Sequence, residues 1–466
     1  MPTIIDLERE YTLKHAKSKE LYEKAINCFA SGVTHDARYE RPFPVYAVKA
    51  KGARKWDVDG NTYVDYIMGH GGLLLGYGED RVVEAFQEQI PRAMHMGSST
   101  ELEIEWAEMI QKLVPCARDS FVRAASCGGE AVMMAIRLAR IYTGREKIVL
   151  HAGAYHGKGD TTIYVNNGPP FGLINVQGIP QGVKEDVLIA PYNNLESVEE
   201  AFDNYEVACI ILQGNALYTK EYIEGLRKLT KEYGVVFIID EVVSGFRYTA
   251  GGAQEYYGVT PDLAVLGKIC GGGAPVGAIC GRKEIMDLYS FKDDYWNRFT
   301  RINVGGTWNA QPLCIVGGTV VMKIIEKERK SLYSRLYSIG CRLTNSFNDQ
   351  AEDLGVSARA VGLPIENPTT FTVNLFNRQV PLEMDYLWKS GPATFEDYDS
   401  KASFNAGSQA SYAFYLSMMN SGVNAFHGRS FITCTKYSEE DLKITEAAFG
   451  TALKILKENK LVGIDK

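Results

Sequence analysis

Short apolar runs alternate with helical segments through the middle of the chain, and this alternation predicts an α/β architecture. Six runs have the length and composition of buried strands: KIVLH (147–151), DVLIAP (186–191), ACIIL (208–212), VVFIID (235–240), LAVLG (263–267) and GAICG (277–281). Amphipathic stretches such as Glu221 to Tyr233 lie between several of them. Because continuous apolar runs suit strands that are covered on both faces, we expect a largely parallel sheet between helices.

The two ends of the chain differ from the middle in their pattern of apolar and polar residues. Long helical patterns run from Lys323 to Asn348 and from Ser438 to Asn459. A chain of 466 residues exceeds one ordinary core, so we predict a large domain at 66–314 and a smaller domain made from 1–65 and 315–466. The polar and aromatic stretch 378–407 is interpreted as an inserted flap.

Composition excludes several functional classes. The 50 basic and 57 acidic residues give a net charge of -7 without a run of Lys or Arg, which argues against nucleic-acid binding. No stretch of 18 apolar residues and no signal-type N-terminus is present, so we expect no membrane contact. The nine scattered cysteines form no CxxC pair, which argues against a zinc ribbon or a redox pair and fits reduced thiols in a cytoplasmic protein. We expect no metal site.

Two neighbouring strand candidates end in residues that can do chemistry. Asp240 ends one run, and ligands of open α/β sheets bind beyond the carboxyl ends of strands. Lys268 follows the next run and precedes Gly271 to Gly273, which suits an amine that must be desolvated to act as a nucleophile. The alternatives are a helix cap or ion pair for Asp240, and a solvated side chain for Lys268.

Two earlier segments suit the recognition of a planar, anionic group. Cys127, Gly128 and Gly129 precede a helical pattern, and bare N–H groups at a helix start bind anions. Tyr155 follows the run 147–151 and could stack on a flat ring. Taken singly, the glycines could form an ordinary turn and the tyrosine an ordinary loop.

The order of these features resembles the fold-type I enzymes that use pyridoxal 5'-phosphate. The segment DEVVSGFRYTAGGAQEYYGVTPDLAVLGKICGGGAPVGAICGRKEIMD (240–287) is similar, nearly residue for residue, to class III aminotransferases of the glutamate-1-semialdehyde aminomutase branch. SGVTHDAR (31–38), KWDVDGNTYVDY (55–66) and SGVNAFHGRSF (421–431) extend the resemblance over most of the chain. It implies a mixed, mostly parallel seven-stranded sheet and a small α+β domain.

The resemblance also implies roles for individual residues. Lys268 would hold the cofactor as a Schiff base and move protons, and Asp240 would pair with the pyridinium nitrogen so that the ring can accept electrons. The remaining cofactor contacts implied by the resemblance are Val242 and Tyr155 on the ring faces, Cys127, Gly128 and Gly129 at the phosphate, and Thr307 from a partner subunit. The last contact implies a homodimer with shared active sites.

Three residues are candidates for reading the substrate. Arg38 and Arg429 match positions that bind a carboxylate in different relatives, and the bidentate, permanently charged guanidinium suits that task. His70 matches an aromatic residue of the substrate pocket. The alternatives are surface salt bridges for the arginines and simple packing for the histidine.

The favoured function is amino transfer between an amino acid, possibly a D- or β-amino acid, and a 2-oxo acid. An isomerase on the same scaffold, either an aminomutase or a racemase, is the alternative, because all of these reactions begin with deprotonation next to the amine. A carboxylate-binding protein without catalysis is disfavoured by the presence of both Lys268 and Asp240. A dehydrogenase is disfavoured because no G-x-G-x-x-G motif opens a helix after the first strands.

Three features depart from the pattern of the family. The turn reads Cys127-Gly128-Gly129 in place of Ser-Gly-Thr, and Gln213 stands where Glu-Pro is usual, before a shortened loop. An acidic residue that the aminomutases carry after their late Gly-Val is missing between Gly422 and Thr435.

Overall fold

The computed structural model describes residues 2–163, 177–376 and 408–463, which form two compact units. Unit 1 contains the described residues of 2–79, 334–376 and 408–463, and unit 2 contains those of 80–333. The contacts therefore divide the chain after Glu79 and after Tyr333, whereas the sequence patterns suggested divisions after 65 and 314. The expected flap at 378–407 lies outside the described residues.

Unit 2 is built on a seven-stranded sheet in the order β4-β10-β9-β8-β7-β5-β6. Its strands are β4 (Val122–Ala125), β5 (Lys147–His151), β6 (Val187–Ala190), β7 (Val207–Gln213), β8 (Val236–Asp240), β9 (Leu263–Gly267) and β10 (Gly277–Gly281). Only β10 runs antiparallel to its neighbours β4 and β9. The prediction of an α/β protein with a mixed, mostly parallel sheet is confirmed, and all six predicted runs are strands.

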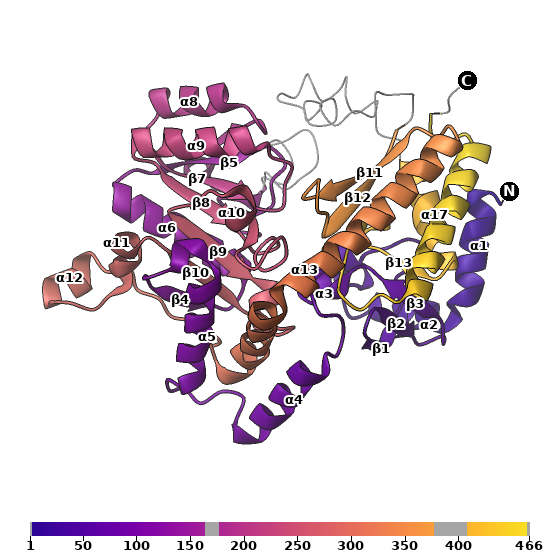
Figure 1. The fold of residues 1–466 in the computed structure, drawn as a ribbon, viewed down its shortest axis with the longest axis horizontal. Helices are drawn as coiled ribbons and strands as arrows, with labels where there is room; N and C mark the ends of the chain where they lie inside the picture. The colour runs from indigo at the N-terminus through magenta and orange to yellow at the C-terminus, as the bar shows by residue number, and fades with distance from the viewer. Residues whose placement is uncertain (1, 164–176, 377–407, 464–466) are drawn as a thin grey trace. The chain divides into compact units, whose positions relative to one another are not determined.

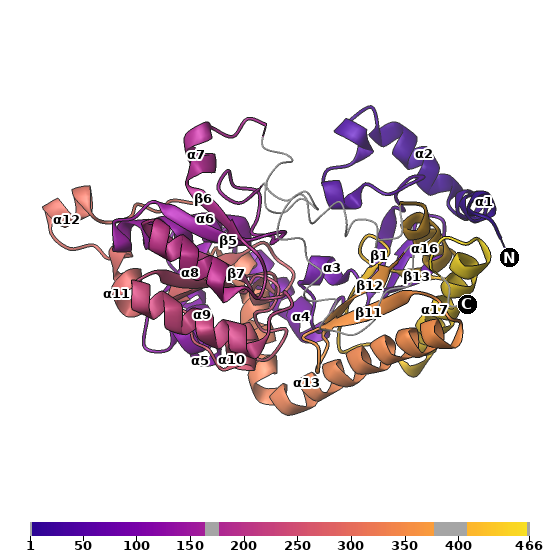
Figure 2. The ribbon, with the colours of Figure 1, turned by 90° about the horizontal axis from the view of Figure 1, so that it is seen from above.

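Helices cover both faces of this sheet, which explains the continuous apolar runs. Apolar residues of α6 (Gly128–Thr143) pack against alternate strand residues, among them Ile148, Ile211 and Ile238. α9 (Lys220–Tyr233) contacts β8 and places Ile223 and Leu226 in the interior. Figure 2 shows α6 and α9 on opposite sides of the sheet. Burial on both faces makes most interior positions of the central strands apolar, as the sequence pattern indicated.

Shorter helices complete unit 2 around the sheet (Figure 1). They are α4 (Asp80–Gln89), α5 (Glu101–Leu113), α7 (Gln181–Glu185), α8 (Leu195–Asn204), α10 (Gly252–Tyr257), α11 (Lys283–Met286) and α12 (Asp294–Phe299). The long helix α13 (Pro312–Asp353) begins in unit 2 and ends in unit 1, with non-helical backbone at Glu328. The predicted helix from Lys323 to Asn348 is part of α13.

Unit 1 contains two small sheets, and one of them combines strands from both ends of the chain. One has the order β1-β2-β3-β13 and the other the order β11-β12-β14. The strands are β1 (Ala47–Lys51), β2 (Arg54–Asp57), β3 (Thr62–Asp65), β11 (Ala358–Leu363), β12 (Thr370–Leu375), β13 (Val423–Asn424) and β14 (Ser430–Ile432). Because the early strand β3 pairs in parallel with the late strand β13, the small unit requires both ends of the chain.

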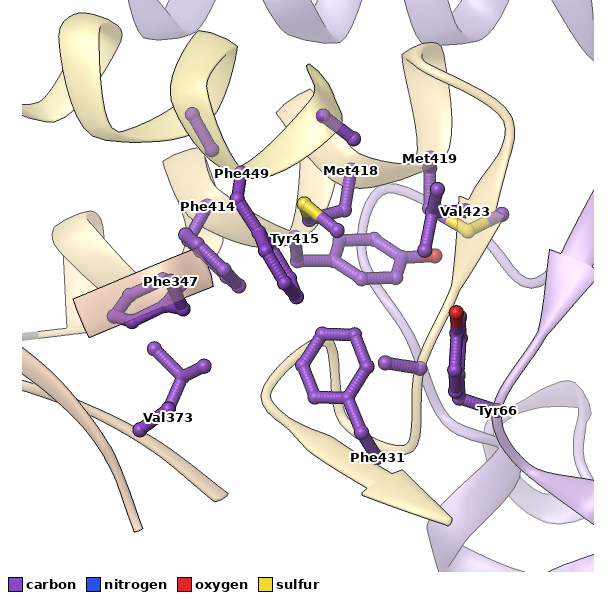
Figure 3. Close-up of a cluster of buried hydrophobic side chains, with 14 of the residues drawn as sticks. Tyr66, Phe347, Val373, Phe414, Tyr415, Met418, Met419, Val423, Phe431 and Phe449 are labelled. Atoms are coloured by element: carbon purple, nitrogen blue, oxygen red, sulfur yellow. The ribbon is translucent and has the colours of Figure 1, made fainter. Parts of the chain in front are cut away.

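The helices of unit 1 enclose an aromatic core. They are α1 (Ile4–Lys14), α2 (Ala16–Ala25), α3 (Met68–Gly71), α16 (Ser408–Asn420) and α17 (Glu439–Glu458). The last agrees with the helix predicted from Ser438 to Asn459, and Ser438 is its N-cap. Phe371 and Phe431 stack with ring centroids 4.6 Å apart, and Phe449 meets both edge-on. Figure 3 shows Phe431 and Phe449 beside Phe414 and Tyr66 in this core.

Two expectations from composition can be compared with the structure. All nine cysteines lie in described parts of the chain, and each is a free thiol. Across the described residues, none of the helices has the length and apolar character needed to cross a bilayer.

Candidate functional site

Asp240 is a buried carboxylate at the carboxyl end of β8. It is 5% exposed, and it lies between Gln213 of β7 and Val265 of β9 in the parallel register. Its Oδ1 accepts the backbone N–H of Val242 at 3.0 Å, and its Oδ2 lies 2.8 Å from Nδ1 of the buried His156. Asp240 therefore caps the following turn, as one alternative proposed, and in addition forms a carboxylate–imidazole pair.

Lys268 follows β9 directly, so its backbone leaves the same edge of the sheet as Asp240. Its φ of 52° lies in the left-handed region, which non-glycine residues rarely adopt and which is often found at functional sites. Burial and the nearby Arg247 guanidinium lower the pKa of the Lys268 amine, and the Asp240 carboxylate partly opposes this shift. A desolvated amine with a lowered pKa is the form that nucleophilic chemistry requires.

The loop that carries Lys268 is fixed by close backbone approaches. A Cβ on Gly272 would lie 2.3 Å from the carbonyl carbon of Gly317 in α13, and a Cβ on Gly318 would lie 1.6 Å from the Cys270 oxygen. The Trp106 indole donates to the same Cys270 oxygen at 2.9 Å. The glycines after Lys268 thus allow α13 to pack directly against the loop and hold the lysine in place.

The turn from Cys127 to Gly129 opens the 16-residue helix α6. Cys127 is the N-cap in extended conformation, and no side chain caps the first N–H groups. A Cβ on Gly128 would lie 2.6 Å from Cγ2 of Val242, so only glycine lets Val242 lie so close. Uncapped amides at the positive end of a long helix are suited to an anion.

Tyr155 lies beside this turn and beside Asp240. Its N–H donates to Oε1 of Gln213 at 2.6 Å, and the nearby Gly157 and Gly129 approach so closely that a Cβ on Gly157 would lie 2.9 Å from Gly129 Cα. Burial, and secondarily the charges of Asp240 and Cys127, raise the pKa of the Tyr155 phenol. The half-exposed ring therefore shares its surroundings with both groups.

We use the name strand-end site for Asp240, Lys268, Val242, Tyr155 and the turn 127–129. The site offers a carboxylate, an amine, an apolar side chain, an aromatic ring and helix amides to one ligand. These groups match the pyridinium nitrogen, aldehyde, ring faces and phosphate of pyridoxal phosphate. Among the described residues no cluster of three potential metal-binding side chains occurs.

Thr307 is exposed on the segment between α12 and α13. Its carbonyl oxygen forms a hydrogen bond with Nε2 of His95. The Ser126 hydroxyl next to the turn 127–129 bonds Oδ1 of Asn309 at 2.9 Å. Thr307 is thus two residues from Asn309, which bonds Ser126 beside the strand-end site, and within the described chain no hydrogen bond joins Thr307 itself to that site.

The three candidate substrate residues lie in unit 1 and differ in their surroundings. Arg38 is exposed and donates to the Thr34 hydroxyl at 2.8 Å. His70 is half-buried, stacks on His35 at 5.4 Å, and meets Phe426 edge-on at 5.4 Å. The ring of His70 is therefore part of an aromatic group.

Arg429 lies on the hairpin that joins β13 to β14, in the same unit. Burial lowers the pKa of its half-buried guanidinium, and no carboxylate from the described parts of the chain forms an ion pair with it. His427 on the same hairpin packs against Phe426 at 4.2 Å. We use the name histidine–arginine cluster for His35, His70, His427 and Arg429.

Sequence reasoning missed three residues that act on members of the strand-end site. His156 had been noted beside Tyr155 but given no role, although it contacts Asp240 across 84 positions of sequence. Gln213 had been noted only as a departure from the family, although it holds the Tyr155 backbone. Arg247, within the matched segment, is fully buried and acts on Lys268. The signal for Arg247 was a charged residue in an apolar turn, whereas the other two contacts depend on the sheet register.

Comparisons with known proteins agree with this arrangement. The family model described as aminotransferase class-III matches residues 35–365. A glutamate-1-semialdehyde 2,1-aminomutase of Methanosphaera stadtmanae is 34% identical over 453 residues, which cover 95% of this chain and 99% of the relative. An omega-transaminase from Sphaerobacter thermophilus superimposes with a TM-score of 0.81 at 28% identity, covering 94% of this chain and 98% of its own. A transaminase with PLP bound gives the same TM-score and identity over 96% of this chain and 99% of its own.

Proposed function

Because this chain belongs to the class III aminotransferase family and uses pyridoxal 5'-phosphate, we propose that it is an isomerase of the aminomutase type that acts on a small amino acid bearing a carboxylate. The observation that carries this proposal is the similarity to a glutamate-1-semialdehyde 2,1-aminomutase over 95% of the chain. The sequence patterns alone favoured an aminotransferase, and the relatives support the isomerase alternative better.

In this proposal, Lys268 and Asp240 perform the central chemistry. When bound, pyridoxal phosphate withdraws electrons from the carbon next to the substrate amine and makes its proton acidic. Lys268 Nζ would bond the cofactor's aldehyde carbon at rest and, once released, take that proton and return it to another carbon. Its lowered pKa supports this role, because an amine whose pKa is lowered is more readily neutral and so able to accept a proton.

Asp240 would hold a proton at the cofactor's ring nitrogen. Its pairing with His156 supports this role, since a positioned imidazole orients the buried carboxylate and shares its charge. Val242 and Tyr155 would contact opposite faces of the ring. The amides of Cys127, Gly128 and Gly129 would bind the phosphate without the hydroxyl groups that Ser-Gly-Thr provides in relatives.

For the substrate, we propose that Arg429 binds the carboxylate and that His70 lines its surroundings. A half-buried guanidinium without an acidic partner among the described residues is costly unless an anion binds there. Arg38 is the less favoured candidate, because it is exposed and already bonded to Thr34. This ranking reverses the slight preference for Arg38 that the sequence suggested.

An aminotransferase is the second candidate. Two observations favour it: the 28% identity to an omega-transaminase over nearly the whole chain, and the absence of an acidic residue between Gly422 and Thr435, where the aminomutases carry one. Both reactions need the same strand-end site, so the substrate side decides between them.

The two candidates differ in what happens to the amine. An aminomutase moves the amine of glutamate 1-semialdehyde from carbon 2 to carbon 1, so the product is an isomer of unchanged mass. The experiment mixes holoenzyme with glutamate 1-semialdehyde without any oxo acid and follows product by mass spectrometry and NMR over many turnovers. Sustained isomerisation supports the proposal. A single turnover that stops with the cofactor in its amine form, and that resumes only when an oxo acid is added, identifies an aminotransferase.

We also propose a homodimer in which Thr307 reaches the partner's phosphate site. The exposure of Thr307 supports this proposal, as does the proximity in sequence of Asn309, which bonds Ser126. Multi-angle light scattering should give a dimer at assay concentration, and Thr307→Ala should weaken cofactor binding. A fully active monomer would rule out a shared site.

A further inference from the structure

Two arginines and a tyrosine from separate elements of unit 2 lie together at one edge of its large sheet. Arg123 is in the edge strand β4, Arg137 is in α6, and Tyr289 ends the short turn that follows α11. α6 packs against both β4 and α11 (Figure 1). The guanidinium carbon of Arg123 lies 5.6 Å from the centroid of the Tyr289 ring. Burial raises the pKa of the Tyr289 phenol, and the charges of Arg123 and Arg137 partly oppose this shift, so both guanidinium groups act on the phenol oxygen.

The Tyr289 hydroxyl is buried and has no hydrogen-bond partner in the described chain. The residue is 7% exposed, and its ring packs with residues of α6 in one core cluster, which keeps the hydroxyl from turning out to water. Arg301 lies on the neighbouring segment, where the Ile302 N–H donates to the Leu288 oxygen at 3.0 Å. The Arg301 Nε is likewise buried and unpartnered among the described residues. Because buried donors without acceptors are costly, two of them in one region indicate a place for an acceptor from outside the chain.

The acidic residues closest in sequence to this region are engaged elsewhere. Glu130, two turns before Arg137 on α6, accepts a backbone N–H at 2.7 Å. Asp287, two residues before Tyr289, pairs with Lys292. Within the described chain no carboxylate forms an ion pair with Arg123 or Arg137, and the contact that Arg123 does make is with the tyrosine ring. The region therefore has uncompensated positive charge around a buried hydroxyl.

This region is separate from the strand-end site. Arg123 lies four residues before Cys127 along β4, and Arg137 lies nine residues after Gly128 along α6. At the rise per residue of a strand and of a helix, each is about 13 Å from the turn that we assign to the cofactor phosphate. A cofactor bound at that turn would leave the arginines and the tyrosine unoccupied.

We propose that Arg123, Arg137 and the Tyr289 hydroxyl form a second anion site, which binds a phosphate group. The three donors come from a strand, a helix and a turn, so they approach from different directions. A planar carboxylate can be satisfied by one guanidinium fork, whereas the tetrahedral phosphate offers oxygens to all three donors. The ligand is inorganic phosphate or the phosphate of a larger molecule. The inference is independent of whether the enzyme isomerises or transaminates its substrate.

Inorganic phosphate is the probe, and the protein is the holoenzyme, because the bound cofactor then occupies its own phosphate site. Isothermal titration at constant ionic strength, with chloride as the balancing anion, should show one phosphate bound per chain. Arg123→Gln and Arg137→Gln should each raise the dissociation constant about tenfold or more, because a charge-assisted hydrogen bond is lost. Lys228→Gln, which removes one exposed charge from α9 on the opposite face of the sheet, is the control and should bind as the wild type does.

Tyr289→Phe is the most specific variant, because it removes only the unpartnered oxygen. Without phosphate, its melting temperature should equal or exceed that of the wild type, since a buried hydroxyl without a partner contributes no stability. With phosphate, the wild type should gain more thermal stability than the variant, and the variant's dissociation constant should be about tenfold higher. Tyr295→Phe, at an exposed position of α12, is the matched control and should match the wild type in both conditions.

Four results would overturn the proposal. They are no phosphate binding to holoenzyme, binding only after the cofactor is removed, unchanged binding in Arg123→Gln and Tyr289→Phe with native circular dichroism, and a lower melting temperature of Tyr289→Phe in phosphate-free buffer. The last result would show that the hydroxyl already has a partner within the protein. Acetate that binds as tightly as phosphate would overturn the assignment to a tetrahedral anion.

Discussion

The strand-end site of unit 2 and the histidine–arginine cluster of unit 1 differ in whether their charged groups have partners within the described chain. Asp240 and Lys268 are placed by neighbouring strands, and Asp240 is paired with His156 and with the Val242 N–H. Arg429 lies on a hairpin and has no acidic partner in the described chain. Asp240 therefore has its partners within the protein, whereas no described carboxylate pairs with Arg429.

In the proposed function, the strand-end site performs the chemistry and Arg429 recognises the substrate. A carboxylate with fixed hydrogen bonds keeps its charge and position through a reaction, which suits a group that must stabilise the same cofactor in every turnover. In the proposed function, a cation without a carboxylate partner among the described residues is suited to binding an anionic substrate group. Replacements in the two regions should therefore have different signatures as well as different magnitudes.

The largest effect is expected from Lys268→Ala. Without the amine, no covalent link to the cofactor can form, and the proton acceptor is lost, so activity should fall to background. Borohydride reduction followed by peptide mapping should find the cofactor on Lys268 in the wild type and on no lysine in the variant. Lys231→Ala, an exposed position in α9, is the control and should label normally. Fixation of the cofactor at another lysine would refute the assignment.

Asp240→Asn should have the next largest effect. The cofactor should still bind, but a neutral ring nitrogen accepts electrons poorly, so the barrier should rise by about 3 kcal/mol or more, about 100-fold in rate. The measurement is single-turnover kinetics with the bound cofactor's absorbance as the signal. Asp262→Asn is a matched control, because this buried aspartate bonds Arg227 and Arg282 and should affect stability alone. Near-normal turnover in Asp240→Asn would reduce Asp240 to a structural cap.

A smaller effect is expected in unit 1. Arg429→Gln should raise KM and lower kcat/KM. The loss of transition-state stabilisation should be about 1.5–3 kcal/mol, because one charge-assisted contact is lost. The variant should also lose the preference for the amino acid over its decarboxylated amine, because that contact is made to the carboxylate. Arg38→Gln provides the comparison and should keep that preference. If the Arg38 variant loses it instead, the ranking of the two arginines is wrong.

The smallest effect is expected from Gln213→Leu, which leaves the Tyr155 N–H without its acceptor. The expected cost is about 1 kcal/mol, or roughly a fivefold weaker cofactor affinity, measured by fluorescence titration. Gln213→Glu retains an acceptor for Tyr155 and should recover most of the affinity, although it loses the donor to Asn215. Equal losses in both variants would show that the hydrogen bond to Tyr155 is unimportant.

Much of the strand-end site could be predicted because its key residues are close in sequence. Asp240 and Lys268 end consecutive strands that pair in parallel, so an apolar run followed by a polar residue suffices to place each of them at the same edge of the sheet. The extent of the described strands agrees with the predicted runs to within two residues at either end. The contact of His156 with Asp240 could not be predicted, because it depends on where a loop after β5 crosses the sheet edge.

The sequence alone therefore determined the α/β fold, the strands of the sheet, the family and the residues of the strand-end site. The fold follows from local hydrophobic patterns, and Asp240, Val242 and Lys268 lie within one continuous motif, whereas Tyr155 and the turn 127–129 were assigned through the resemblance to the family. Only the tertiary structure brought His35 and His70 together with Phe426 of the turn that carries Arg429, and only it distinguished the half-buried Arg429 from the exposed Arg38. The surroundings of a side chain depend on packing between distant segments, and no local pattern records which segments will meet.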